Sequence, residues 1–248
     1  MNQSNIVSFM KIYVQKTANE FISESAFSVF YGFKSLGYTV IPFEENAPLP
    51  REKENIVYGK IGVVLNSLEQ IGITPPQALT IPEELYEFLG RSIGETTIKA
   101  VRKIENFPVF IKPKYINKLF NGYVIFNKED LSYIKDYEED TIIFTSDVVQ
   151  FVSEYRCFVL NGELVGCKHY KGNFICTPDF NIIKAAIKKV ANAVIAYSID
   201  FGITNNNETL LIEINDTYSL SSYGLESKLF CELIKQRWNE IVRSGMPN

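Results

Sequence analysis

VQFVSEYRCFVLNGELVGCKHYKG, residues 149–172, carries the strongest local signal in the chain. Two runs rich in β-forming residues, 153–160 and 163–170, flank Asn161-Gly162. Asn-Gly favours the positive backbone dihedrals of a two-residue hairpin turn. The pattern therefore predicts an antiparallel hairpin in which Leu160 pairs with Glu163.

If the two strands pair without interruption from the turn, each residue of the first strand has one partner on the second. Arg156 then lies opposite Cys167, and Glu154 lies opposite His169. Glu154, Arg156 and His169 then lie on one face, and Lys168 lies on the other. A β-bulge in the second strand would instead turn Lys168 to the face of Arg156.

A second group of polar side chains lies near the C-terminus. Glu213 and Asn215 are two residues apart in an apolar run, 208–215, so a strand there points both to one face. Asp200 lies on the preceding predicted strand, 198–203. Buried carboxylates need compensation, and Mg²⁺ prefers carboxylate and amide oxygens. The group predicts a magnesium–nucleotide site, although a polar strand end remains an alternative.

Two cations also lie within predicted strands. Lys112 ends the apolar run 107–113, and Arg156 occupies the middle of the hairpin. Such residues either face solvent or meet an anion, for which a magnesium-bound triphosphate is one candidate. The glycine-rich phosphate-binding loop of P-loop proteins and the dinucleotide fingerprint are both missing from the sequence.

The flanking segments predict an α/β organisation. Strand 11–15, helix 20–36 and strand 38–43 form a βαβ unit, which indicates a parallel sheet. Helices are expected over 181–196 and 222–242, the latter amphipathic.

The composition of the chain excludes some classes of function. The 248 residues have a formal net charge of −4 and 46% hydrophobic content, so we expect a soluble globular protein without a nucleic-acid partner. We expect no signal peptide, no membrane span and a cytoplasmic location. The spacing of the four cysteines and the single histidine argue against a zinc site, and we expect mostly buried, reduced thiols.

Four motifs in this order resemble the ATP-grasp superfamily, and most closely its compact clade of ATP-dependent carboxylate–amine ligases named for two arginines and a lysine. The resemblance covers about residues 105–243. The segments that carry it are Phe110-Ile111-Lys112-Pro113 with Lys118, Phe120 and Gly122; residues 149–159; Gly166 to Gly172; and Leu211-Ile212-Glu213-Ile214-Asn215-Asp216 with Tyr218-Ser219-Leu220 and Tyr223-Gly224-Leu225.

The resemblance implies a mixed α/β and α+β architecture. An N-terminal pre-ATP-grasp α/β domain, residues 1–80, would precede an ATP-grasp domain, residues 81–248. Within that domain, a small subdomain, 105–150, and a large subdomain, 151–248, would hold ATP between them.

The resemblance also assigns roles to residues. Lys112 would contact the α- and β-phosphates, and Arg156 would bind the γ-phosphate or an acyl phosphate; these two form the catalytic set. The nucleotide would also meet the loop with Lys118 and Gly122, the adenine hinge Gln150, Phe151 and Val152, and the hairpin residues Glu154, Lys168 and His169. Magnesium would be held by Asp200, Glu213 and Asn215. Ser219, Tyr223 and Gly224 would border the substrate.

The chain departs from the family pattern on the acceptor side. The second arginine has no obvious counterpart, so either His169 serves there or a bulge brings in Lys168. Asn173 stands where related sequences lead us to expect an aspartate.

The resemblance implies an enzyme that uses ATP and Mg²⁺ to convert a carboxylate to an acyl phosphate, which an amine then attacks. The substrates would be small molecules, peptides or protein termini, and the enzyme a monomer or homodimer. An ATP-grasp phosphotransferase and a non-catalytic nucleotide-binding or assembly protein are the alternatives.

Overall fold

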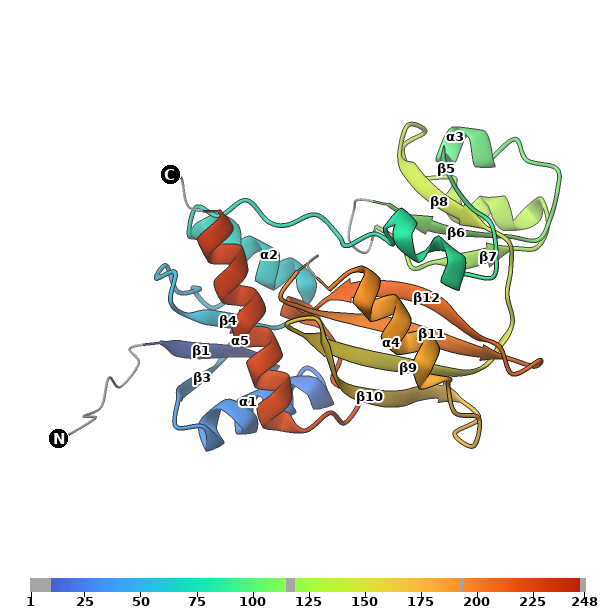
Figure 1. Ribbon diagram of the computed structural model, residues 1–248. Helices are drawn as coiled ribbons and strands as arrows, with labels where there is room; N and C mark the ends of the chain where they lie inside the picture. The colour runs from blue at the N-terminus through green and yellow to red at the C-terminus, as the bar shows by residue number, and fades with distance from the viewer. Residues whose placement is uncertain (1–9, 115–118, 192–193, 246–248) are drawn as a thin grey trace.

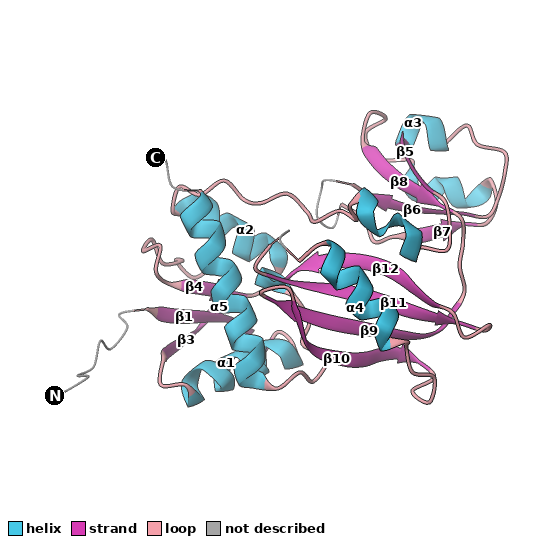
Figure 2. Cartoon of the chain, viewed as in Figure 1, coloured by secondary structure: helices cyan, strands magenta, loops and turns pink. Residues whose placement is uncertain are grey.

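A computed structural model describes residues 10–114, 119–191 and 194–245. Within these ranges the chain builds three β-sheets, each with its own apolar core (Figures 1 and 2). Lys118 lies outside the described residues. No helix within these ranges has the length and apolar character needed to span a bilayer.

The N-terminal sheet is parallel, as the βαβ pattern predicts. Its central strand pairs with two parallel neighbours and, at its end, with a short antiparallel strand. The elements are β1 (Lys11–Thr17), β2 (Glu20–Phe21), α1 (Glu24–Ser35), β3 (Thr39–Glu44), β4 (Ile56–Tyr58) and α2 (Ile61–Gln70). The expected helix start at residue 20 is wrong, because Glu20-Phe21 pairs with β1 and the Ser23 side chain caps α1.

The C-terminal helix α5 (Ser227–Ser244) completes this N-terminal core. It lies against α1 and buries Phe230, Ile234 and Trp238 there (Figure 1). The expected start at residue 222 is wrong, since Glu226 caps the helix and Gly224 has a positive φ of 76°. A segment assigned to the large subdomain by sequence therefore also stabilises the N-terminal domain.

The second sheet is antiparallel, and we call it and the elements packed on it the small subdomain (Figure 1). Its strand order is β5 (Ile93–Thr97), β8 (Ile142–Ser146), β6 (Val109–Pro113) and β7 (Tyr123–Ile125). Helix α3 (Ile98–Val101) and the 3₁₀ helix η2 (Glu129–Ile134) pack on it, whereas the preceding 3₁₀ helix η1 (Glu83–Phe88) packs against the third sheet and its helix. Because β5 pairs with β8, this sheet begins before residue 105.

The third sheet is also antiparallel, and we call it and the elements packed on it the large subdomain. Its order is β10 (Glu163–Gly172), β9 (Phe151–Leu160), β11 (Ala196–Thr204) and β12 (Thr209–Asp216), and α4 (Phe180–Lys189) packs against it. The predicted extension of this helix to residue 196 is wrong, because Ala196 already pairs with β9.

The hairpin turn is confirmed, but the predicted register is not. Asn161 and Gly162 have φ angles of 53° and 76°, as a tight turn requires. A bulge between Leu164 and Gly166 then shifts β10 by one residue. Arg156 consequently faces Lys168 rather than Cys167.

A close contact with a distant residue accompanies the bulge. A Cβ atom on Gly166 would lie 2.4 Å from the Leu225 side chain, so a residue without one lets Leu225 pack closely against the strand. A glycine inside a strand is a recognised sign of a bulge.

Candidate active site

A row of four charged side chains crosses the large sheet. Lys168 on β10 lies opposite Arg156 on β9, which lies opposite Asp200 on β11, which lies opposite Glu213 on β12. Directly opposed residues of antiparallel strands point to the same face. We call Lys168, Arg156, Asp200 and Glu213 the charged row.

The centre of the charged row is a buried ion pair. Arg156 donates from Nε to Asp200 Oδ1 at 2.9 Å and from Nη2 to Oδ2 at 2.7 Å. Asp200 is fully buried and Arg156 is 7% exposed. This two-pronged geometry fixes both side chains and places the guanidinium 3.8 Å from Glu213.

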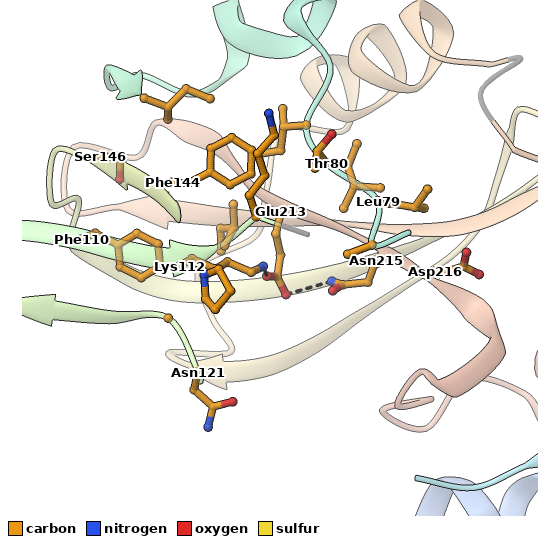
Figure 3. Close-up of a pocket in the computed structure, with 18 of the residues that line it drawn as sticks. Leu79, Thr80, Phe110, Lys112, Asn121, Phe144, Ser146, Glu213, Asn215 and Asp216 are labelled. Atoms are coloured by element: carbon orange, nitrogen blue, oxygen red, sulfur yellow. Dashed lines mark hydrogen bonds and ion pairs between the residues drawn. The ribbon is translucent and has the colours of Figure 1, made fainter. Parts of the chain in front are cut away.

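Glu213 joins the charged row to the small subdomain. Lys112, from β6, donates to Glu213 Oε2, and Asn215 Nδ2 donates to Oε1 at 2.8 Å. Figure 3 shows Lys112 and Asn215 converging on this carboxylate from opposite sides. Two residues 101 positions apart in sequence, Lys112 and Glu213, thus meet where the two sheets face one another.

The two carboxyls of the charged row differ in acidity. Burial raises the pKa of Asp200 to about 6, although Arg156 opposes the shift. Burial also acts to raise the pKa of Glu213, but Lys112, Asn215 and Arg156 outweigh it and the net shift is downward. Glu213 is therefore the more firmly ionised carboxylate at neutral pH.

A cavity of about 350 Å³ lies beside this group. Its walls come from β6 and β8 of the small sheet, from β12 and the segment after it, and from the connection 78–81. Phe110, Phe144 and Ile212 give it apolar walls, while Lys112, Glu213 and Asn215 supply charged and polar groups. A volume of this size suits a small-molecule ligand.

The predicted site residues fall into two groups around this cavity. Lys112, Gly122, Glu213, Asn215 and Ser219 line it. The other candidates within the described residues do not: Gln150, Phe151, Val152, Glu154, Arg156, Lys168, His169, Asp200, Tyr223 and Gly224.

The expected hinge does not lie at the cavity. Gln150 is exposed and Val152 is 36% exposed, whereas Phe144 and Ser146, at the end of β8, line the wall. The chain therefore meets the cavity on β8, several residues before the segment that the sequence motif indicates.

Lys168 and His169, the two candidates to replace the second arginine of the family, lie on opposite faces of the sheet. Lys168 faces Arg156, while His169 faces Tyr155, with ring centroids 5.1 Å apart, on the opposite side of the sheet. The placement of Lys168 matches the bulged alternative. Glu154 lies on β9 beside the charged row and binds Lys171 and Tyr170.

Two tyrosines stack next to Arg156. The rings of Tyr170 and Tyr223 are 4.8 Å apart and nearly parallel, and the guanidinium carbon lies 4.9 Å from the Tyr223 ring centroid. Tyr223 has a φ of 46°, uncommon for a non-glycine residue, and is 41% exposed. This pair extends the site from the charged row toward solvent.

Two arginines that bind β12, the strand carrying Glu213 and Asn215, were not predicted from the sequence. Arg91 lines the cavity and donates to the carbonyls of Leu211 and Ile212 on the outer edge of β12. Arg237 on α5 binds Asp216, whose side chain is 5% exposed, with Nε at 2.9 Å from Oδ1. Neither arginine lies in a recognisable motif, because each acts across a long sequence separation.

The resemblance found in the sequence implies a magnesium ion, and the donor atoms of the site show whether they suit it. Among the described residues, His, Cys, Asp and Glu alone supply no group of three that could hold a metal ion. Glu213 with the amide of Asn215 lines the cavity, while both oxygens of Asp200 accept from Arg156. The carboxylate of Glu213 and the amide oxygen of Asn215 match the oxygen preference of Mg²⁺, so these two donors fit the ion, with Asp200 behind them.

A comparison with protein families identifies the family of the chain. The model of an ATP-grasp domain family, the second family of the clade named for two arginines and a lysine, matches residues 88–233, more than half of the chain. The chain belongs to this family of ATP-grasp proteins. No curated protein sequence matches it.

Solved structures share the fold over nearly the whole chain. D-alanine–D-alanine ligase from Bacillus anthracis, complexed with ATP, aligns with 96% of this chain and 99% of its own at 12% identity and a TM-score of 0.52. A RimK domain ATP-grasp protein from Sphaerobacter thermophilus aligns with 96% and 100% at 11% identity and a TM-score of 0.54. N5-carboxyaminoimidazole synthase from Aspergillus clavatus aligns with 91% and 76% at 14% identity and a TM-score of 0.56.

Proposed function

We propose that this protein is an ATP- and Mg²⁺-dependent ligase that joins a carboxylate to an amine through an acyl-phosphate intermediate. The observation that carries the proposal is the meeting of Lys112 with the charged row at the edge of the cavity. The residues of this arrangement all lie within the range 88–233 that the ATP-grasp family model matches, which supports the proposal. The carboxylate–amine ligases among its structural neighbours give the proposal its reaction class.

The cavity offers two environments that suit the two ends of ATP. Phe110, Phe144 and Ile212 provide apolar surfaces for the adenine, near Ser146. Lys112, directly opposite Phe144 in the strand register, provides a point charge for the phosphates. The nucleotide would thus lie between the small and large sheets, with its phosphates toward Glu213.

The ion pairs of the site would rearrange when ATP binds. Lys112 now contacts Glu213, and in the complex it would contact phosphate oxygens instead. Glu213 and Asn215, with Asp200 behind them, would hold Mg²⁺, which offsets phosphate charge when bound. Arg156, 3.8 Å from Glu213, would contribute positive charge toward the transferring phosphoryl group.

The proposed reaction has two steps. An oxygen of the substrate carboxylate attacks the γ-phosphorus and the bond to the β-phosphate oxygen breaks, which gives an acyl phosphate and ADP. The amine nitrogen then attacks the acyl carbon, and the carbon–oxygen bond to phosphate breaks, which gives an amide, inorganic phosphate and a proton. Arg156 and Lys168 would hold the acyl phosphate, and Ser219, Tyr223 and Gly224 would border the organic part of the substrate.

Product analysis tests the proposal. The protein is incubated with ATP, Mg²⁺ and pooled carboxylates and amines, including amino acids and short peptides, with Glu213→Gln as the inactive control. ADP, inorganic phosphate and a new amide in equal amounts are expected. ADP with a stable phosphate ester would indicate a phosphotransferase, and ATP binding without turnover across the pools would favour a non-catalytic protein.

A further inference from the structure

Two cysteines face each other across the β9–β10 hairpin. Cys157 and Cys167 are directly opposed in the register, and their sulfur atoms are 3.2 Å apart. Both thiols are free. The same bulge that turns Lys168 toward Arg156 creates this pairing, since the regular register would place Cys167 opposite Arg156.

The geometry meets the requirements of a disulfide. Directly opposed residues of antiparallel strands have Cα atoms about 4.5 to 5.5 Å apart. Disulfides form at Cα separations of about 4.4 to 6.8 Å, with a sulfur–sulfur bond of about 2.05 Å. The two sulfurs here need to approach by only about 1 Å, which side-chain rotation can supply.

The two thiols differ in access and acidity. Cys157 is fully buried beneath α4, whereas Cys167 is partly exposed on β10, an edge strand of the sheet. The Cys157 thiol donates a hydrogen bond to the Cys167 sulfur, and this bond lowers the pKa of Cys167. An accessible thiol with a lowered pKa is the one that reacts first.

We propose that Cys157 and Cys167 are a redox-active dithiol that hydrogen peroxide or an organic hydroperoxide converts to an intrachain disulfide. The Cys167 sulfur attacks the peroxide, the oxygen–oxygen bond breaks, and Cys167 becomes a sulfenic acid with release of water or an alcohol. The Cys157 thiol then attacks the sulfenic sulfur, which forms the S–S bond and releases water. The two thiols lose two electrons, and the peroxide gains them.

This dithiol lies directly behind the charged row. Cys157 follows Arg156 and Cys167 precedes Lys168, with their side chains on the opposite face of the sheet. A disulfide there would fix the register that sets Lys168 against Arg156. The inference rests on the cysteines alone and stands whether or not the proposed ligase activity does.

Peptide mass analysis after oxidation tests the proposal. Trypsin cuts after Arg156 and Lys168, so one peptide, 157–168, contains both thiols and Cys176 lies elsewhere. The folded protein is treated with one equivalent of hydrogen peroxide and then alkylated before digestion. Peptide 157–168 is expected to be unalkylated and two hydrogen atoms lighter than its reduced form, in wild type and in Cys176→Ser alike.

The single variant Cys157→Ser is expected to stop at oxidised acids of Cys167. A sulfinic acid on Cys167 in the wild type, a link from Cys167 to Cys176, or full alkylation of both thiols would overturn the proposal. Phenylarsine oxide gives a second test that needs no variant. It is expected to bind once per chain, bridging both sulfurs with loss of one water, and alkylation of both thiols in its presence would contradict the pairing.

Discussion

Arg156 and Asp200 form a two-pronged ion pair in the middle of the large sheet, with donor–acceptor distances of 2.9 and 2.7 Å. Asp200 is one of the three predicted magnesium ligands, yet both of its oxygens are engaged by the arginine proposed to serve the transferring phosphoryl group. The pair links the proposed metal site to the proposed phosphate site. A change in either residue should therefore affect both functions.

Asp200 should give the ligand-free protein a distinctive pH dependence. Its pKa rises from the ordinary 3.8 to about 6 on folding, so the folded state binds the proton more tightly than the unfolded state does. This contribution to the free energy of unfolding is fully present below about pH 4 and is lost as the pH rises through about 6. Denaturant unfolding at several pH values measures it.

Asp200→Asn supplies the comparison, because it cannot titrate. The free energy of unfolding of wild type minus that of the variant should fall between about pH 4 and 6 and level off above. The other carboxyls cancel in this difference. A difference that rises over the same range would mean that Arg156 outweighs burial.

Lys112→Ala should weaken ATP binding about tenfold or more, because a charge-assisted contact with phosphate is worth about 1.5 to 3 kcal/mol. Isothermal titration with ATP and Mg²⁺ measures the effect. Lys128→Ala is the matched control, since Lys128 is an exposed lysine of the same subdomain, away from the cavity. Equal affinities in the two variants would remove Lys112 from the site.

Lys168→Ala should lower kcat/KM by about tenfold, which corresponds to about 1.4 kcal/mol of transition-state stabilisation. His169→Ala should leave it nearly unchanged, because the imidazole lies on the opposite face of the sheet against Tyr155. The reverse order of effects would show that the histidine, not the lysine, serves the site. Steady-state kinetics with an identified substrate pair decides the matter.

Arg237→Ala should destabilise the protein by about 3 to 5 kcal/mol, because it leaves the Asp216 carboxylate, shielded from solvent, without its cation. Arg237 also binds Glu240, which accepts from the backbone of Ile195. Chemical denaturation provides the measurement. Arg243→Ala, an exposed arginine of the same helix, should change stability by less than about 0.5 kcal/mol, and similar losses in both would contradict the account.

The sequence predicts the local elements of the site better than their register. The Asn161-Gly162 turn and the shared face of Glu213 and Asn215 follow from local rules, and the structure has both. The shifted pairing of Lys168 depends on the bulge near Gly166, which Leu225 stabilises from a distant segment. A regular extrapolation from the turn cannot anticipate that packing.

Long-range pairing also explains the residues that were missed. Arg91 and Arg237 hold β12 through partners 120 and 21 residues away. Two predicted helix ends, at residues 20 and 196, differ from the structure for a related reason, since Glu20-Phe21 and Ala196 pair with neighbouring strands. In each case a tertiary contact decided between two locally acceptable structures.

The central claim is a magnesium-dependent ATP site at Lys112, Glu213 and Asn215, and a thermal-shift titration tests it most directly. Wild type and Glu213→Gln are each titrated with ATP, with and without Mg²⁺. At about 100 times the dissociation constant a ligand adds about 2.7 kcal/mol of stability, so a clear rise in Tm is expected for wild type with Mg²⁺. The rise should be much smaller without the ion and in the variant. No rise in wild type at millimolar ATP with Mg²⁺, or an equal rise in Glu213→Gln, would contradict the account.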